Sequence, residues 1–168
     1  RKSGRMAVSK TVGADEVAEA IEAGAHDFGE NRPDSLEGKR ARFPQQTWHF
    51  IGNIQSRRIP DIVRDAALVH SLYQQRHVPK FDAAAAASGK VQDVLLEVNV
   101  SGEASKSGLA PSEVAGMLEY CAGFPHVRAY DDGAAGRCAT GSRMLRRSGA
   151  FARRSAAWAR RGTGRRIR

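Results

Sequence analysis

Lys10 is the residue of this sequence whose surroundings best fit a reactive amine. It follows the short apolar run from Met6 to Val8, which is typical of a β-strand, and a helix-like segment begins soon after it. Burial at a strand end disfavours the charged form of an ammonium group and lowers its pKa. Because only the neutral amine attacks an aldehyde, a lysine in this position is suited to forming a Schiff base. Most lysines at strand ends are solvated surface charges, so Lys10 alone does not identify the chemistry.

Other polar residues recur directly after apolar or β-branched runs. They are Glu30-Asn31, Asn53 to Gln55, His70-Ser71 and Asn99 to Ser101. In α/β folds the carboxyl ends of parallel strands share one face, and that face binds ligands. These residues, Asn31 and Ser71 among them, are therefore candidate ligand contacts on the same face as Lys10. One cofactor can reach all of these groups only if the strands curl into a barrel.

The elements that must position these residues alternate between strand and helix. Strands are expected near 6–10, 26–31, 47–52, 67–71 and 91–100, and helices near 14–24, 35–42, 56–64, up to 87 and from 111. In the first helix Val17 and Ile21 share one face, and Gly24 sits where a helix commonly ends. The strands are continuous apolar runs, which is typical of a parallel sheet covered by helices.

Length and composition indicate one globular domain. The 168 residues suffice for a real core but fall short of the roughly 250 of a complete (β/α)8 barrel. No apolar run approaches the ~20 residues of a membrane span. Cys121 and Cys138 have neither metal-site nor disulfide-framework spacing, which favours a reducing, cytoplasmic location and no metal. The chain opens at Arg1, without an initiator methionine, so residues upstream are expected.

The net charge of +9 is confined to the end of the chain. Residues 1–128 hold 16 Lys and Arg against 16 Asp and Glu, whereas residues 129–168 hold 11 arginines against two aspartates. A basic excess raises the possibility of a nucleic-acid partner, so its location in the chain matters. The body of the protein carries no such excess.

A family resemblance emerges from motifs that occur in a fixed order over residues 6–128. The motifs are Ala7-Val8-Ser9-Lys10-Thr11, Phe28-Gly29-Glu30-Asn31, Trp48 to Ser56, Val69-His70-Ser71, Val98 to Gly102 and Lys106 to Leu109. Together they resemble the pyridoxal phosphate homeostasis proteins, single-domain relatives of the alanine racemase N-terminal barrel. Linked motifs in order are far more specific than any one alone.

The resemblance implies a TIM-type (β/α) barrel that binds pyridoxal 5′-phosphate (PLP). Lys10 matches the family's Schiff-base lysine, and Asn31 is implied to lie beside the cofactor ring. Members of the family are regarded as carriers or regulators of the cofactor pool rather than enzymes. A holder needs a neutral amine and a fitted pocket, whereas a racemase also needs a second base on the opposite face, and no tyrosine is placed for that role.

The remaining polar residues favour structural roles. His49, which lies between two aromatic residues, and His70 are expected to be packed and hydrogen-bonded rather than catalytic. Cys121 is expected to be an inert buried thiol. Gln55 and the residues after it suit an anion contact and a solvated helix start equally well.

The resemblance ends after Arg128, which divides the chain into a partial PLP-binding barrel, 1–128, and an Arg/Ala/Gly-rich tail, 129–168. Where the family places a Met-Thr-Met segment on a sixth strand, the chain reads Ala129-Tyr130-Asp131-Asp132-Gly133. A coding sequence for these residues, shifted by one base, encodes Met-Thr-Met-Ala. We therefore expect the tail to be a disordered frameshift product, and the barrel to have about five to six β-α units without its C-terminal strands. Resequencing of the gene tests this.

The altered tail also removes the expected phosphate anchor. In TIM barrels phosphate commonly binds after strands seven and eight. The family's Ser-Met-Gly-Met-Ser and Arg-x-Gly segments, which serve there, are absent from this sequence. Lys10 is still able to react with an aldehyde, but retention of PLP is expected to be weakened.

Two alternatives remain open. The arginine-rich tail would suit nucleic acid or an acidic surface through phosphate contacts, although it carries no RNA-binding motif. A PLP-dependent amino-acid racemase is the second alternative. The preferred interpretation is a monomeric PLP carrier whose partners are the cofactor and PLP-dependent apo-enzymes, with no membrane or nucleic-acid partner.

Overall fold

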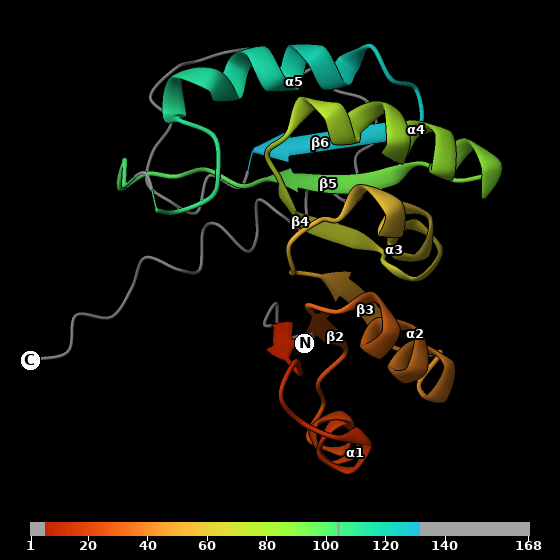
Figure 1. The fold of residues 1–168 in the computed structure, drawn as a ribbon. Coiled ribbons are helices and arrows are strands. Elements are labelled where there is room, and N and C mark those ends of the chain that lie inside the picture. The colour runs from red at the N-terminus through yellow and green to blue at the C-terminus, as the bar shows by residue number, and fades with distance from the viewer. Residues whose placement is uncertain (1–5, 104, 132–168) are drawn as a thin grey trace, which may run out of the picture. The chain divides into compact units, whose positions relative to one another are not determined.

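A computed structural model describes residues 6–103 and 105–131 of the chain. Strands and helices alternate along this part of the protein (Figure 1). The strands are β1 Met6–Val8, β2 Asp27–Glu30, β3 Thr47–Phe50, β4 Leu68–Leu72, β5 Gln92–Leu96 and β6 Val127–Asp131. The α-helices are α1 Ala14–Glu22, α2 Pro33–Arg42, α3 Ile59–Asp65, α4 Val78–Ala87 and α5 Val114–Ala122. Short 3-10 turns η1 Ser56–Arg58, η2 Gln75–His77 and η3 Pro111–Glu113 lead into the last three helices.

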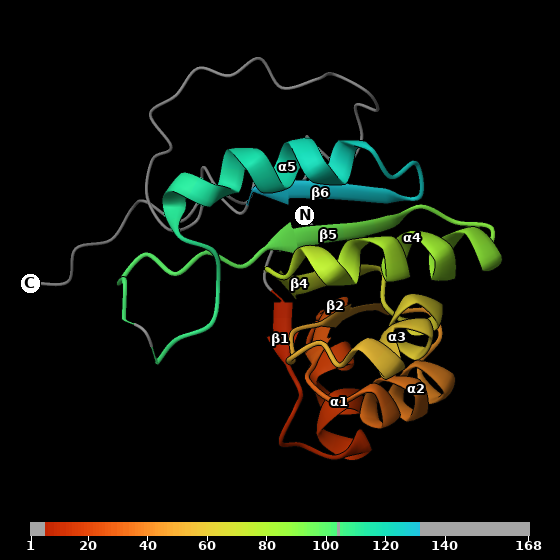
Figure 2. The ribbon, with the colours of Figure 1, turned by 45° about the horizontal axis from the view of Figure 1, so that its top comes forward.

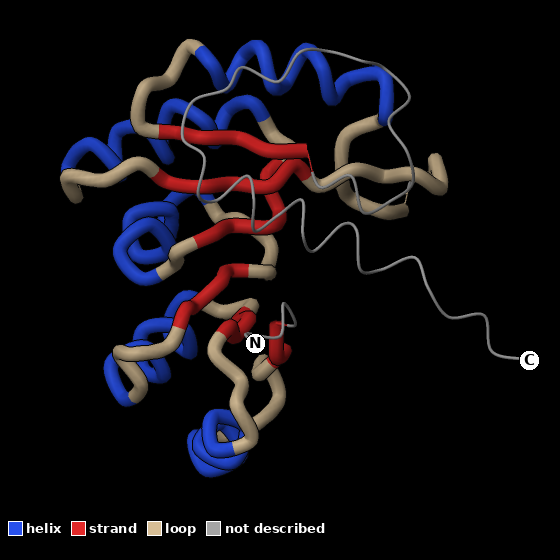
Figure 3. Tube along the Cα trace, turned by 180° about the vertical axis from the view of Figure 1, so that it is seen from behind, coloured by secondary structure: helices blue, strands red, loops and turns tan. Residues whose placement is uncertain are grey.

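The six strands form one parallel sheet in the order β1-β2-β3-β4-β5-β6. Each strand therefore lies beside its neighbour in sequence, and the strand direction turns steadily across the sheet (Figure 3). The helices lie along one side of the strands (Figures 1 and 2). A doubly wound sheet would reverse its strand order and carry helices on both faces. The arrangement is that of a (β/α) barrel with part of its strands present, which confirms the predicted fold class.

The hydrophobic core lies between the sheet and the helices. Phe28 and Trp48 are adjacent in register on β2 and β3, are both 1% exposed, and have ring centroids 5.2 Å apart. Leu36 of α2 and Phe81 of α4 are fully buried in the same cluster. Because side chains alternate along a strand, the intervening positions face the other side of the sheet. Those positions include His49, which directly follows Trp48.

Strand β6 extends the fold beyond the predicted boundary at Arg128. All five of its residues pair with β5, from Gln92 opposite Val127 to Leu96 opposite Asp131. The residues after Arg128 therefore still suit a strand, although they differ from the family's motif. The rest of the predicted tail, 132–168, lies outside the described residues, together with its arginines and the expected disorder.

The described residues contain neither a membrane-spanning helix nor a metal-binding cluster. No helix there is long and apolar enough to cross a membrane. Nor does that part of the chain bring together three or more His, Cys, Asp or Glu side chains in a geometry that would hold a metal ion.

Candidate functional site

Lys10 lies in a tight turn at the carboxyl end of β1. The Val12 amide donates to the Ser9 carbonyl at 3.2 Å, so Lys10 and Thr11 form the centre of the turn. The Ser9 amide donates to the Gly29 carbonyl at 3.0 Å, which ties the base of the turn to β2. The burial of Lys10 that its place at a strand end suggested is not observed, because the residue is exposed. Among the described residues its amine makes no hydrogen bond or ion pair. The amine is therefore accessible at the end of the sheet where ligands bind in this class of fold.

A buried ionic cluster supports this turn from beneath. Lys39 of α2 donates to the Ser9 carbonyl at 2.6 Å, to the Val12 carbonyl at 2.8 Å and to Glu30 Oε1 at 2.6 Å. Ser9 Oγ donates to the same Glu30 oxygen at 2.6 Å. The Glu30 side chain is 1% exposed and that of Lys39 14%. The sequence does not predict this cluster, because the weakly amphipathic sequence of α2 does not indicate which side chain faces the sheet.

Asn31 and Ser71 both contact Gly52, the second residue after β3. A Cβ atom at Gly52 would lie 2.0 Å from the Asn31 carbonyl oxygen, so only glycine allows the two backbones to approach this closely. Ser71 of β4 is buried, and its Oγ donates to the Gly52 carbonyl at 2.5 Å. The structure thus joins the ends of β2, β3 and β4 through these residues. The Ser71 hydroxyl donates its proton to a backbone carbonyl. Contact of Ser71 or Asn31 with a cofactor stays a prediction.

A hollow of about 190 Å³ opens beside Asn31, between the segments that follow β2 and β3. Asn53 and Gln55, both singled out in the sequence, line it together with Arg58. Arg58 donates to Asp34 at 2.5 Å and to Asp61 at 2.7 Å, and these carboxylates raise the pKa of its guanidinium. Two carboxylates already neutralise this arginine, so the hollow has no uncommitted positive charge from Arg58 with which to attract an anion.

His49 and His70 form a hydrogen-bonded pair across β3 and β4. His49 Nδ1 lies 2.9 Å from His70 Nε2, and His49 Nε2 lies 3.7 Å from Asp27 Oδ1 on β2. Burial, with a smaller effect of His49, lowers the pKa of His70 to about 4. The His49 imidazole also holds the pKa of the Asp27 carboxyl below its usual range. The hydrogen bond between them confirms the expectation of packed, hydrogen-bonded histidines; the expectation that neither is catalytic stays a prediction.

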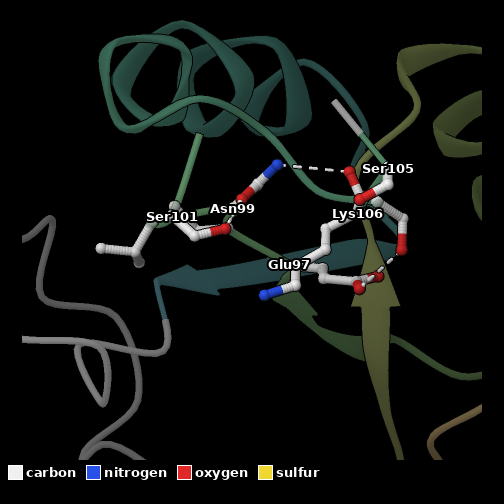
Figure 4. A pocket seen from close by; sticks show the side chains of 8 residues that line it. Glu97, Asn99, Ser101, Ser105 and Lys106 are labelled. Atoms are coloured by element: carbon white, nitrogen blue, oxygen red, sulfur yellow. Dashed lines mark hydrogen bonds between the residues drawn. The ribbon is translucent and has the colours of Figure 1, made fainter. Parts of the chain in front are cut away.

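The segment after β5 folds into a loop around Asn99. Asn99 Nδ2 donates to the carbonyls of Glu103 at 2.9 Å and Lys106 at 3.2 Å, while its Oδ1 accepts from Ser101 Oγ and the Gly102 amide. Figure 4 shows the cavity beside this loop, with a volume of about 440 Å³, bordered by Glu97, Asn99 and Lys106. The Asn99 side chain is fully used in shaping the loop.

Burial also perturbs two groups outside this end of the sheet. It lowers the pKa of Lys90, whose Nζ donates to the carbonyls of Val63 and Ala66. Lys90 precedes β5, however, so it belongs to the amino ends of the strands and is no substitute for Lys10. Burial raises the pKa of the Cys121 thiol to about 11, which agrees with the expected inert thiol.

Comparison with known proteins agrees with the motif resemblance. The family description "Alanine racemase, N-terminal domain" matches residues 1–130. A pyridoxal phosphate homeostasis protein of Pseudomonas aeruginosa is 40% identical over 127 residues, covering 74% of this chain and 55% of that protein. Its counterpart in Aquifex aeolicus is 32% identical over 125 residues, covering 73% of this chain and 55% of that protein. The chain thus spans about half the length of these relatives.

Solved structures show the same relationship. PipY of Synechococcus elongatus PCC7942, solved with PLP bound, has a TM-score of 0.67 at 27% identity and is matched over 74% of this chain and 59% of PipY. An alanine racemase of Clostridium difficile, at 15% identity and a TM-score of 0.59, shares the fold over 75% of this chain and 34% of its own. The chain belongs to the alanine racemase N-terminal domain family and, within it, groups with the pyridoxal phosphate homeostasis proteins.

Proposed function

We propose that this chain binds PLP and holds it as a Schiff base on Lys10. The observation that carries the proposal is the exposed Lys10 amine, which has no partner among the described residues and sits in a turn fixed at the carboxyl end of β1. PLP would supply the aldehyde carbon and Lys10 the amine nitrogen, and their condensation would release the aldehyde oxygen as water. The names of the relatives and the PLP-bound structure of PipY support the choice of cofactor.

The described residues fit the aldehyde end of this cofactor. Asn31 follows the strand next to Lys10 and presents an amide side chain that is exposed at the same end of the sheet. The phosphate end has no matching anchor in the sequence, since the family's phosphate-binding segments are absent. We therefore expect attachment through Lys10 together with weak retention.

A carrier role in intracellular PLP homeostasis follows better from this site than turnover does. Tyr130 is hydrogen-bonded to Asp93 at 3.5 Å, and burial raises its pKa to about 12, which makes it a poor base at neutral pH. We propose a cytoplasmic, monomeric carrier that passes PLP to apo-enzymes. Assays for racemisation of D- and L-amino acids are expected to show no turnover.

Absorbance spectroscopy of the purified chain with added PLP tests the central proposal. The wild-type chain is expected to develop a visible band that free PLP lacks, and Lys10→Ala is expected to abolish it. Lys80→Ala is the matched control, because Lys80 is an exposed lysine on α4, and it is expected to keep the band. A band of equal strength in Lys10→Ala would contradict the assignment.

A further inference from the structure

Lys39 binds both ends of the turn that carries Lys10. Its ammonium has three N–H donors, and the three acceptors are the Ser9 carbonyl, the Val12 carbonyl and Glu30 Oε1, all within 2.8 Å. Ser9 and Val12 are the first and last residues of the turn. Every donor of Lys39 is therefore used, and two of the three hold the backbone on either side of Lys10.

The turn depends on this support because β1 offers little of its own. The strand has three residues and, in the described part of the chain, pairs with β2 alone. Val8, its last residue, is 52% exposed. A short outer strand opens more readily than a central one, so the amine that follows it needs another anchor to stay in place.

The same contacts withhold Lys39 itself from reaction with an aldehyde. Three acceptors can be satisfied at once only by the ammonium form, and an ammonium has no lone pair with which to attack. Glu30 keeps this cation in place, since its carboxylate is almost fully buried and would otherwise be left without a counter-ion. Of the two lysines at this turn, Lys39 has all three donors engaged and Lys10 is exposed.

We propose that Lys39 is a positioning residue for Lys10: it fixes the turn from Ser9 to Val12 and so directs PLP to the Lys10 amine. This inference rests on the proposed function for the identity of the ligand. Lys39 holds the turn whether or not PLP is present, so this part of the proposal is measurable without PLP.

The test compares the wild-type full chain with a Glu30→Gln/Lys39→Met double variant. The double change removes both charges together, so no unpaired buried carboxylate remains and the glutamine oxygen still accepts from Ser9 Oγ. Its urea unfolding midpoint is expected to stay near that of the wild type. Lys80→Met, a change of an exposed lysine on α4, is the control for loss of a surface charge.

Two readouts are measured on each protein. Trypsin cleavage after Lys10 is expected to accelerate about tenfold in the double variant, because two charge-assisted hydrogen bonds to the turn are lost. The PLP-dependent visible band is expected to form about tenfold more slowly, or to a correspondingly smaller extent. Cleavage after Lys106, an exposed lysine in the loop after β5 that is present in all three proteins, is the internal reference and is expected not to change.

The outcomes separate the two proposals. A wild-type chain that forms no band contradicts the proposed function. A wild-type band that forms at the same rate in the double variant, with unchanged cleavage after Lys10, contradicts the positioning role of Lys39. A loss of band formation together with a collapse of the urea midpoint also counts against the role, because general unfolding then accounts for it.

Discussion

At the scale of single residues, the candidate site depends on a close backbone contact beneath it. Gly52 approaches the Asn31 carbonyl so closely that a Cβ atom would lie 2.0 Å from its oxygen, and Ser71 Oγ holds the Gly52 carbonyl from the other side. Gly52 and Ser71 therefore fix the position of the Asn31 backbone relative to the neighbouring strands. The motif containing Gly52 predicted a strand end, but the need for glycine there became clear only from the contact.

Gly52→Ala is expected to destabilise the chain by about 2 kcal/mol or more, because the added methyl group overlaps backbone atoms that have no free space to move into. Gly116→Ala is the matched control, since Gly116 lies on an exposed face of α5 with nothing within 4 Å of the added atom. There the same change should stabilise by about 0.5–1 kcal/mol. Urea unfolding measures both. Similar effects of the two substitutions would disprove the importance of the close approach.

At the scale of secondary-structure elements, a row of polar side chains joins β2, β3 and β4 on the face opposite the hydrophobic core. Asp27, His49 and His70 follow one another across these strands. No other described ionisable group contributes to the lowered pKa of His70, whereas His26 adds slightly to that of Asp27. The row therefore responds to pH mainly through its own members.

This row predicts how stability depends on pH. Between pH 6.5 and about 4 the unfolded chain protonates His70 while the folded chain does not, so stability falls as the pH is lowered through this window. The full shift of His70 corresponds to roughly 3.4 kcal/mol as an upper bound. The lowered pKa of Asp27 acts only below its ordinary value of 3.8, outside the window. His77, whose pKa burial also lowers, is present in both proteins compared below.

His70→Gln is the variant that isolates this effect. Its urea midpoint is expected to change less than that of the wild type between pH 7 and pH 4.5. The difference between the two proteins should level off about one pH unit above 6.5, where His70 is neutral in both the folded and the unfolded state. Parallel pH profiles for the two proteins would show that His70 is not buried in its neutral form.

The sequence indicated the order and type of the elements well, and their side-chain contacts poorly. Continuous apolar strands and the helix of Val17 and Ile21 follow from local periodicity. The strand expected over 91–100 ends at Leu96 instead. The chain beyond it forms a loop, and Val98 pairs with Leu109 in an isolated parallel β-bridge. The Lys39–Glu30 pair could not be predicted, since residues nine apart on different elements meet only once the helix is packed on the sheet.

At the scale of the whole molecule, the described sheet has two outer strands. In that part of the chain β1 pairs with β2 alone and β6 with β5 alone. Strand edges of this kind favour association with other chains. The relatives are about twice as long as the matched region, and in TIM barrels the phosphate site commonly lies after strands seven and eight.

A chimera tests whether the C-terminal part of a relative strengthens PLP binding by this chain. Residues 1–131 would be joined to the C-terminal remainder of the Pseudomonas aeruginosa relative, which is 40% identical over the matched region. The chimera is expected to unfold at a higher temperature and to bind PLP at least about tenfold more tightly, equivalent to 1.4 kcal/mol. The same chimera with Lys10→Ala should keep the gain in stability without the visible band. Equal PLP retention by the chimera and this chain would contradict the phosphate-anchor explanation.

Attachment of PLP to Lys10 is tested most directly by identifying the lysine that PLP modifies. Borohydride reduction of the PLP-treated full chain makes the attachment permanent, and peptide mass mapping then locates it among Lys2, Lys10, Lys39, Lys80, Lys90 and Lys106. We predict that the label lies on Lys10, with little on Lys39 because its three donors are engaged. Label distributed equally over the exposed lysines, or concentrated on Lys39 or Lys90, would contradict the assignment of Lys10 as the site of PLP attachment.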